Sequence, residues 1–202
     1  RVKRWFNVSG INHLKMAQRD DRGVLVIGVH FMSLELGGRA LGVERGQKHP
    51  LALALQVTVE SLIRPRFQRW LRDTLMQCEK SHRRRIIFEL AEADVCQYIG
   101  RLQPVMRLVN ALGIRIAVVQ AGLTLVGTSW IKQLDVEVIK LHSGLSRNIE
   151  KRSENQLLVQ SLVEACKGMP VQVFATGVLS RSEWQVLSQC GVTGGQGEFF
   201  AA

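Results

Sequence analysis

The chain has 202 residues, 46% of them hydrophobic, and a formal net charge of +10 at pH 7. This length and apolar content predict one globular domain with a sizeable core, and the longest apolar run, Val24 to Met32, is too short to cross a bilayer. Four scattered cysteines form no C-x-x-C pair, which disfavours a zinc site and a disulfide framework: Cys78, Cys96, Cys166 and Cys190.

Residues 1–50 predict little regular structure. They contain scattered arginines and glycines, as at Gly37-Gly38, and hold one strand-like run, Val24 to Phe31. We therefore expect residues 1–50 to form an atypical N-terminal segment and residues 51–202 to form the main domain.

From Leu51 onward, short apolar strands alternate with amphipathic helical stretches. This alternation is typical of repeated βα units around a parallel sheet, so the predicted fold class is α/β. Six strands are expected, centred on Gln56-Val57-Thr58, Ile86-Ile87-Phe88, Ile116-Ala117-Val118, Val138-Ile139, Val171 to Phe174, and Gly194 to Phe199.

The helices between these strands carry clear start signals. Pro65 suits a first helical residue because its φ is already fixed near the helical value. Ser153 with Gln156, and Ser180 with Glu183, have the spacing of capping boxes and predict helices beginning near 154 and 181. Five apolar residues at four-three-four-three spacing predict a buried helix face: Val95, Ile99, Leu102, Met106 and Val109.

The excess positive charge lies entirely before Ile86. Residues 1–50 hold nine Lys/Arg and four acids, residues 51–85 eight and three, and residues 86–202 ten and ten. A one-sided basic region suits a polyanion partner such as RNA, because neutralising phosphates releases counterions. The alternative is a solvated basic surface without a ligand, and the numbers of charged residues in each segment do not distinguish the two.

The densest basic run is Lys80 to Arg85, just before an expected strand. In an exposed turn, Arg83, Arg84 and Arg85 would be candidate contacts to an RNA backbone, since arginine pairs bidentately with phosphate. A solvated turn without a ligand is an equally good interpretation.

A second candidate for RNA binding lies on the helix after Pro65. There Arg66 and Arg69 interleave with Phe67 and Trp70, and aromatic rings beside arginines can stack on unpaired bases. On amphipathic grounds we favour the other interpretation, in which both aromatic residues face the core and the arginines face water.

Four segments resemble, in order and spacing, motifs of the EAL-domain family: Phe88 to Glu92, Ile139 to His142, Ala175 to Val178, and Gly195 to Gly197. These bacterial phosphodiesterases hydrolyse cyclic di-GMP with two divalent metals. The resemblance covers about Leu51 to Ala202 and implies an EAL-type modified (β/α)8 TIM-like barrel that is altered or incomplete at its N-terminus. Catalytic groups of such barrels lie at the C-terminal ends of strands, where the quoted segments fall.

Most of the family's metal-binding positions are changed in this sequence. A metal-binding asparagine of the family corresponds to Gln56, whereas the acid of the E-L-T-E motif is kept as Glu89. The paired aspartates of the D-D-F-G motif correspond to Val119 and Gln120, so both charges are absent.

The later motifs are changed in the same direction. The I-K-I-D motif keeps its lysine as Lys140 and replaces its aspartate with His142, the glutamate of A-E-G-V-E becomes Thr176, and Gln196 of the Q-G motif is kept. One carboxylate cannot hold two hard cations, which need several oxygen ligands. The resemblance therefore implies no metal, no cofactor and no catalytic residue, only relict family positions: Gln56, Glu89, Gln120, Lys140, Thr176 and Gln196.

Longer segments are similar to one group within the family: Gln56 to Phe67, Phe88 to Asp94, Asn155 to Glu164, and Gly191 to Gly197. That group comprises membrane-anchored regulators with degenerate GGDEF and EAL domains, which direct ribonuclease E to the small RNAs that sequester the carbon-storage regulator. The resemblance implies three partners, namely the glucose-specific phosphotransferase protein, the ribonuclease E pathway and small regulatory RNA. It also implies a cytoplasmic domain of a parent protein anchored at the inner membrane.

The family's signature glutamate has no counterpart at the expected place. Leu34-Glu35-Leu36 is superficially similar, but it lies too close to Gln56 to leave room for a strand, a helix and their loops. We interpret it as a coincidence. Because residues 1–50 lack the first barrel segment, our hypothesis is that they come from a misread frame, a foreign segment or a rearranged N-terminus.

Three functions are compatible with these residues. The first is a non-catalytic scaffold that promotes ribonuclease E-dependent decay of regulatory RNAs through protein and RNA binding. The second is a weak or altered phosphodiesterase that uses Glu89, Lys140 and Gln196, and the third is a sensor that binds cyclic di-GMP without cleaving it. The absence of the paired aspartates favours the scaffold.

Overall fold

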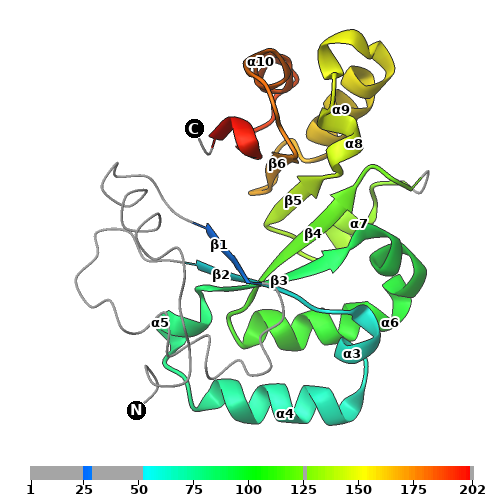
Figure 1. Cartoon of the computed structure of the whole chain (residues 1–202). Helices are drawn as coiled ribbons and strands as arrows, with labels where there is room; N and C mark the ends of the chain where they lie inside the picture. Colours follow the sequence, from blue (N-terminus) through cyan, green and yellow to red (C-terminus); the bar gives the residue numbers. More distant parts are fainter. Residues whose placement is uncertain (1–24, 29–51, 125–126, 201–202) are drawn as a thin grey trace.

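The computed structural model describes residues 25–28, 52–124 and 127–200, and these contain a sheet of seven strands (Figure 1). The strands lie side by side in chain order, and each is parallel to the next. The expected parallel βα architecture is therefore confirmed. The strands are β1 (Leu25–Gly28), β2 (Ala52–Gln56), β3 (Ile86–Ala91), β4 (Arg115–Ala121), β5 (Val138–Leu141), β6 (Gln172–Thr176) and β7 (Gly194–Gln196).

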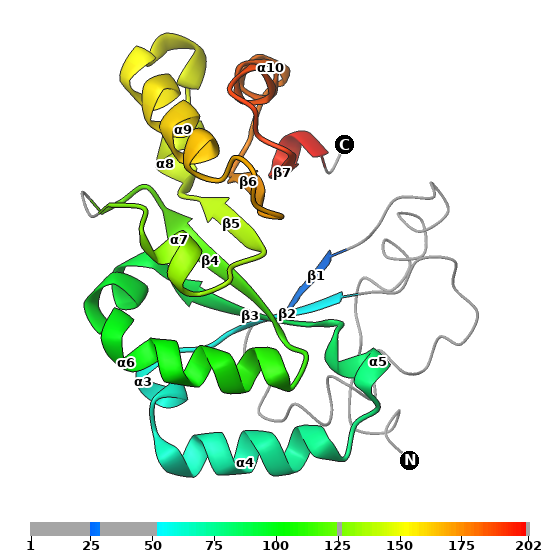
Figure 2. The same ribbon diagram turned by 180° about the vertical axis from the view of Figure 1, so that it is seen from behind.

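Helices connect the strands in two groups (Figures 1 and 2). The first group accompanies β2 to β4 and the second accompanies β5 to β7. The helices are α3 (Val59–Leu62), α4 (Pro65–Met76), α5 (Lys80–Arg83), α6 (Glu92–Ala111), α7 (Trp130–Gln133), α8 (Ser143–Ser146), α9 (Ser153–Ala165) and α10 (Arg181–Gln189), with 3₁₀ turns η2 (Ile149–Lys151) and η3 (Glu198–Phe200).

The two faces of the sheet bury different side chains. Alternate strand residues such as Leu53, Phe88 and Ile139 belong to the main core, which they share with apolar residues of the helices. The opposite face carries a much smaller apolar cluster made of Ala54, Ile87, Ala117 and Val138, with Ala52 and Phe174 against it. Because side chains alternate along a strand, this inner face also receives the residues at the ends of the strands.

Several local expectations are confirmed. Pro65 is the first residue of α4, and the expected apolar stripe of α6 is buried, with Ile99 half-buried and the other four members almost inaccessible. Ser180 and Glu183 form a complete capping box at the start of α10. The helix and strand periods of the sequence therefore placed the main elements correctly.

Other local expectations were wrong. β2 ends at Gln56, one residue before Val57, and Thr58 instead caps the short helix α3. β7 covers only Gly194–Gln196, and the chain then turns into η3. Ser153 forms no capping box, because the Gln156 side chain donates a hydrogen bond to the Ile149 carbonyl (2.8 Å) and no side chain caps α9.

Trp70 also departs from expectation. It is 44% exposed on α4, although amphipathic spacing predicted that it would face the core. Phe67 does pack partly against the core, and its ring lies 5.4 Å from that of Trp70. The core contacts of α4 come instead from Leu71 and Leu75, so the buried stripe is too narrow to include the indole.

Some expectations fall outside the described residues: the Gly37-Gly38 pair, the Leu34-Glu35-Leu36 segment, and the parts of the Val24 to Phe31 run on either side of β1. Of the run, Leu25–Gly28 pairs in parallel with β2. Among the helices of the described part of the chain, none has the length and hydropathy to cross a membrane.

Glu183 connects three segments around the start of α10. Its buried carboxylate accepts hydrogen bonds from the backbone N–H groups of Asn148 (2.8 Å), Leu179 (2.7 Å) and Ser180 (3.2 Å). Burial by itself raises the pKa of this carboxyl group, but these donors and the charge of Arg147 lower the pKa below its usual value. The ionised form therefore stabilises the fold.

We expect Glu183→Gln to lower the free energy of unfolding by about 1–3 kcal/mol near neutral pH, because buried N–H donors lose a charged acceptor. A lowered folded-state pKa means that this stabilisation is present above the ordinary glutamate pKa of 4.5 and is lost as pH falls through the folded value. Urea unfolding at several pH values measures both effects. The exposed Glu198 supplies the matched control, Glu198→Gln; a loss that stays constant down to acidic pH would contradict the assignment.

Candidate site at the carboxyl ends of the strands

Five polar side chains lie on the inner face of the sheet near the carboxyl ends of the strands, at successive register positions, and we call this set the inner row. Gln56 of β2 is the register partner of Glu89 in β3, and Thr176 of β6 is the register partner of Gln196 in β7. Lys140 of β5 lies between these pairs and has Phe174 of β6 as its partner. The structure therefore brings together the relict positions that the sequence predicted, apart from Gln120.

The centre of this row is an ion pair between Glu89 and Lys140. The Lys140 ammonium lies 2.5 Å from the Glu89 carboxylate, and their side chains are only 6% and 9% exposed, respectively. The pair spans β4, where Ala117 is the register partner of Glu89 and lies beside Val138 of β5. The small side chain of Ala117 leaves the inner face open for the two long side chains to meet.

Sequence reasoning missed the role of Glu92, the second acid of the Phe88 to Glu92 segment. Glu92 is 2% exposed at the start of α6, and its Oε2 accepts hydrogen bonds from the backbone N–H groups of Gly122 (3.0 Å) and Thr124 (3.2 Å). It thereby holds the loop after β4. An acid in the first turn of a helix was the available signal, but its partners lie about thirty residues away and could not be read from local spacing.

The remaining relict positions make hydrogen bonds or are exposed to solvent. The Thr176 hydroxyl donates to the Leu141 carbonyl (2.7 Å), which joins β6 to β5. Gln56 and Gln196 are exposed. Gln120 is exposed too and has a positive φ of 58°; it lies near the end of β4, where the pairing with β5 shifts register between Val118 and Ala121.

His142 and Val119 are the residues that the family resemblance assigns to two aspartate positions. His142 caps α8, and its Nδ1 accepts a hydrogen bond from the Gly144 N–H (3.0 Å). Val119 is half-buried and contributes no polar atom. In the part of the chain that the structure describes, no three His, Cys, Asp or Glu side chains gather as a metal site would need.

The basic candidates lie away from this row. Lys80 to Arg85 form α5 and its end, directly before β3, and so lie at the amino ends of the strands. Arg83 is not in an open turn as expected: its Nη1 contacts the Met76 sulfur at 3.8 Å, and its Nε is buried. Arg84 is exposed and Arg85 is half-buried, whereas Arg66 and Arg69 are exposed on α4: the structure does not join the two groups into one compact cluster.

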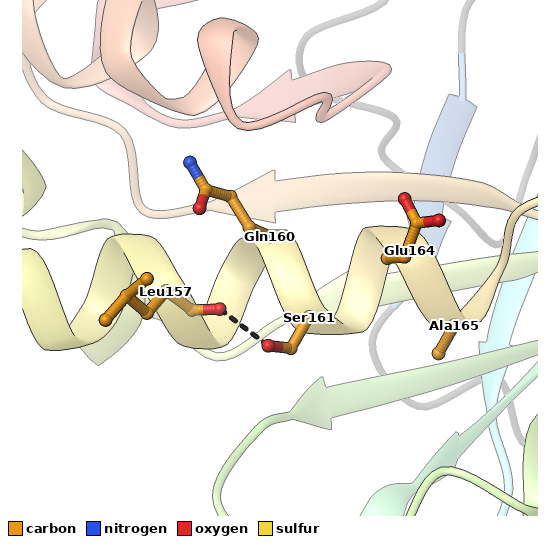
Figure 3. A pocket seen from close by; sticks show the side chains of 5 residues that line it. All are labelled: Leu157, Gln160, Ser161, Glu164 and Ala165. Atoms are coloured by element: carbon orange, nitrogen blue, oxygen red, sulfur yellow. Dashed lines mark hydrogen bonds between the residues drawn. The ribbon is translucent and has the colours of Figure 1, made fainter.

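A shallow depression of about 600 Å³ runs along α9 and is lined by Leu157, Gln160, Ser161, Glu164 and Ala165. Figure 3 shows that the Ser161 hydroxyl donates to the Leu157 carbonyl (2.9 Å), so this serine is engaged within its own helix. The depression holds no pair of groups suited to catalysis, and none of its residues belongs to the row at the strand ends.

Comparison with known proteins separates the N-terminal part of the chain from the rest. A model of bacterial lipid A biosynthesis acyltransferases matches residues 1–69. A lipid A biosynthesis palmitoleoyltransferase of Escherichia coli is 63% identical over 43 residues, which are 21% of this chain and 14% of that enzyme.

A longer similarity covers about three quarters of the chain. The RNase E specificity factor CsrD of Escherichia coli is 80% identical over 150 residues, which are 74% of this chain and 23% of CsrD. The chain thus spans less than a quarter of that relative. Among solved structures, the calcium/cy-diGMP complex of Klebsiella pneumoniae BlrP1 superposes with a TM-score of 0.67 at 25% identity, covering 80% of this chain and 40% of that one.

The family is settled by the remaining match. The model of the EAL domain covers residues 38–202, which include six of the seven strands and every residue of the inner row. The fold and the positions of the retained motifs agree with it. The chain therefore belongs to the EAL domain family.

Proposed function

We propose that the domain is a non-catalytic scaffold that promotes ribonuclease E-dependent decay of small regulatory RNAs. One observation carries the proposal: the only two carboxylates of the Phe88 to Glu92 motif are both occupied by protein donors. Glu89 pairs with Lys140, and Glu92 accepts from two backbone N–H groups. Neither carboxylate is free to bind a cation without losing an existing partner.

The other groups of the inner row do not fit a pair of divalent metals. Mg²⁺ and Mn²⁺ prefer several carboxylate, carbonyl or water oxygens at short distances. Here Gln56 and Gln196 offer amide oxygens, Thr176 uses its hydroxyl on Leu141, and Val119 offers nothing. Since the described residues offer no second free carboxylate near Glu89, we propose that the site holds no metal and has no phosphodiesterase activity.

The similarity to CsrD supports the biological part of the proposal, because that relative is named as an RNase E specificity factor. We propose that this domain acts in the same pathway, with regulatory RNA and the glucose-specific phosphotransferase protein as partners. The parent protein would be anchored at the inner membrane with this domain in the cytoplasm. The RNA contacts are proposed to come from Arg66, Arg69, Arg84 and Arg85, with Arg83 supporting α5.

We further propose that the N-terminal segment, residues 1–50, is of foreign origin and is joined to the EAL domain within residues 38–69, where the two family matches overlap. The match of residues 1–69 to the acyltransferase model favours this origin over a misread frame or a rearrangement within one gene. Sequencing the parent transcript across residues 38–69 checks it. A reading frame that instead continues upstream into an ordinary first EAL strand would contradict the proposal.

The first test concerns catalysis. We expect the purified chain to leave cyclic di-GMP intact in Mg²⁺ or Mn²⁺, as measured by nucleotide chromatography beside an active EAL phosphodiesterase in the same buffer. Hydrolysis of cyclic di-GMP by the wild-type chain that is abolished by Glu89→Ala would refute the proposal of a non-catalytic scaffold. Calorimetry with cyclic di-GMP tests the sensor alternative, because a scaffold without a nucleotide site gives no saturable heat.

The second test concerns the role of the ion pair. We expect Lys140→Met to lower the free energy of unfolding by about 3–5 kcal/mol, because it leaves a buried carboxylate unpaired. The double variant Glu89→Leu, Lys140→Met should recover most of that loss. Lys132→Met, on the exposed surface of α7, is the matched control and should change stability by less than about 0.5 kcal/mol. Equal losses in the single and double variants would show that the pair has no structural role.

The third test concerns RNA decay. In a reaction with purified ribonuclease E, we expect the chain to shorten the half-life of a small regulatory RNA, as measured by gel electrophoresis over time. The Glu89→Leu, Lys140→Met variant should do so equally well, since no chemistry takes place at the strand ends. A half-life that the wild-type chain leaves unchanged would contradict the proposal for this part of the parent protein.

A further inference from the structure

Trp70 is the least expected feature of the surface. It is 44% exposed on the outer side of α4, which lies at the periphery of the molecule in both views (Figures 1 and 2). The half-buried Phe67 lies one helical turn before it, with a centroid distance of 5.4 Å and an interplanar angle of 42°. One ring thus packs on the core and supports a second ring that presents much of its surface to solvent.

The residues around this indole are positively charged. Arg66 lies four positions before Trp70 and so on the same side of the helix, and Arg69 precedes it; both are exposed. Asp73 lies three positions after Trp70, but its carboxylate is already paired with Arg72 at 3.1 Å. The acid therefore neutralises a neighbouring arginine and leaves Arg66 and Arg69 to set the local charge.

The positive surface continues beyond the C-terminal end of α4. The contact between Arg83 and the Met76 sulfur joins α5 to this end of the helix, and Figure 1 shows α5 beside it. Lys80 and Arg84 are exposed there. Since α4 has twelve residues, the helix is about 18 Å long; we call its exposed side, together with Lys80 and Arg84, the α4 strip, in which the exposed Glu79 stands directly before Lys80.

We propose that this strip binds single-stranded RNA, with an unpaired base stacked on Trp70 and the adjoining phosphates on Arg66 and Arg69. An aromatic face accepts any base, and its stacking requires that the base be out of a duplex. A purely electrostatic surface for an acidic protein would not need an exposed indole among its arginines. The inference rests on the RNA-binding part of the proposed function and adds the class of ligand and the residues that contact it.

The test uses the full chain and a fluorescently labelled, unstructured oligouridylate, with a duplex RNA of equal length as the second ligand. Trp70→Ala should weaken binding of the single strand by about five- to a hundredfold and leave duplex binding unchanged. Trp70→Phe should restore most of the affinity. Arg66→Ala with Arg69→Ala should reduce the slope of log affinity against log salt by about 1.4, because two single-strand phosphate contacts are lost.

Matched controls separate stacking from general effects. Arg101→Ala with Arg107→Ala removes two exposed arginines from α6, and Leu157→Ala removes an exposed apolar side chain from α9; neither should alter binding. Equal weakening by Trp70→Ala and Leu157→Ala, an equal effect on duplex RNA, or no RNA binding by the wild-type chain would each overturn the inference. So would binding of polyglutamate with the same sensitivity to Trp70→Ala. None of these results bears on cyclic di-GMP turnover, which tests the scaffold separately.

Discussion

The ion pair between Glu89 and Lys140 determines whether the inner face of this domain offers a free carboxylate to a ligand. Moving either charge out of water is costly, and the cost is offset only when the partner is close and well placed. The two side chains meet across β4 on the face that carries the smaller apolar cluster, which includes Ala54, Ala117 and Phe174. In this setting, each charge is retained because the other is present, and the carboxylate is no longer an independent ligand. The pair thus gives Glu89 a structural role that does not depend on a metal.

The other buried acids of the described chain, Glu92 and Glu183, also have close partners that offset the cost of their burial. Glu92 binds the loop after β4, and Glu183 binds the backbone around η2 and the start of α10. Each carboxylate accepts N–H groups that would otherwise be unpaired in the interior, which is the usual condition for burying such a group. In this domain, buried acids join segments that are distant in sequence, and none converges with another on a common point.

The order and approximate positions of the strands could be predicted from the sequence. The strands are short apolar runs and the helices have apolar residues at three- and four-residue spacing, and both patterns can be seen within a short stretch of chain. The positions of the inner row came from the family resemblance, which assigned these residues to motifs at the C-terminal ends of strands. Contacts that depend on distant segments were not accessible in this way: Glu92 finds its donors about thirty residues away, and Gln156 prefers the Ile149 carbonyl to the capping role that its spacing suggested. Trp70 shows a different limit, because helical periodicity identifies a stripe but not its width, and Leu71 with Leu75 already fills it.

Thr176 stands at the position that the family resemblance assigns to a glutamate. Its hydroxyl donates a hydrogen bond to the Leu141 carbonyl and so joins β6 to β5. An ionised acid at this position would remove that link, because a carboxylate can accept but cannot donate a hydrogen bond. If the domain is non-catalytic, as we propose, a return to the glutamate would cost the bond between β5 and β6, so the substitution is easier to make than to reverse.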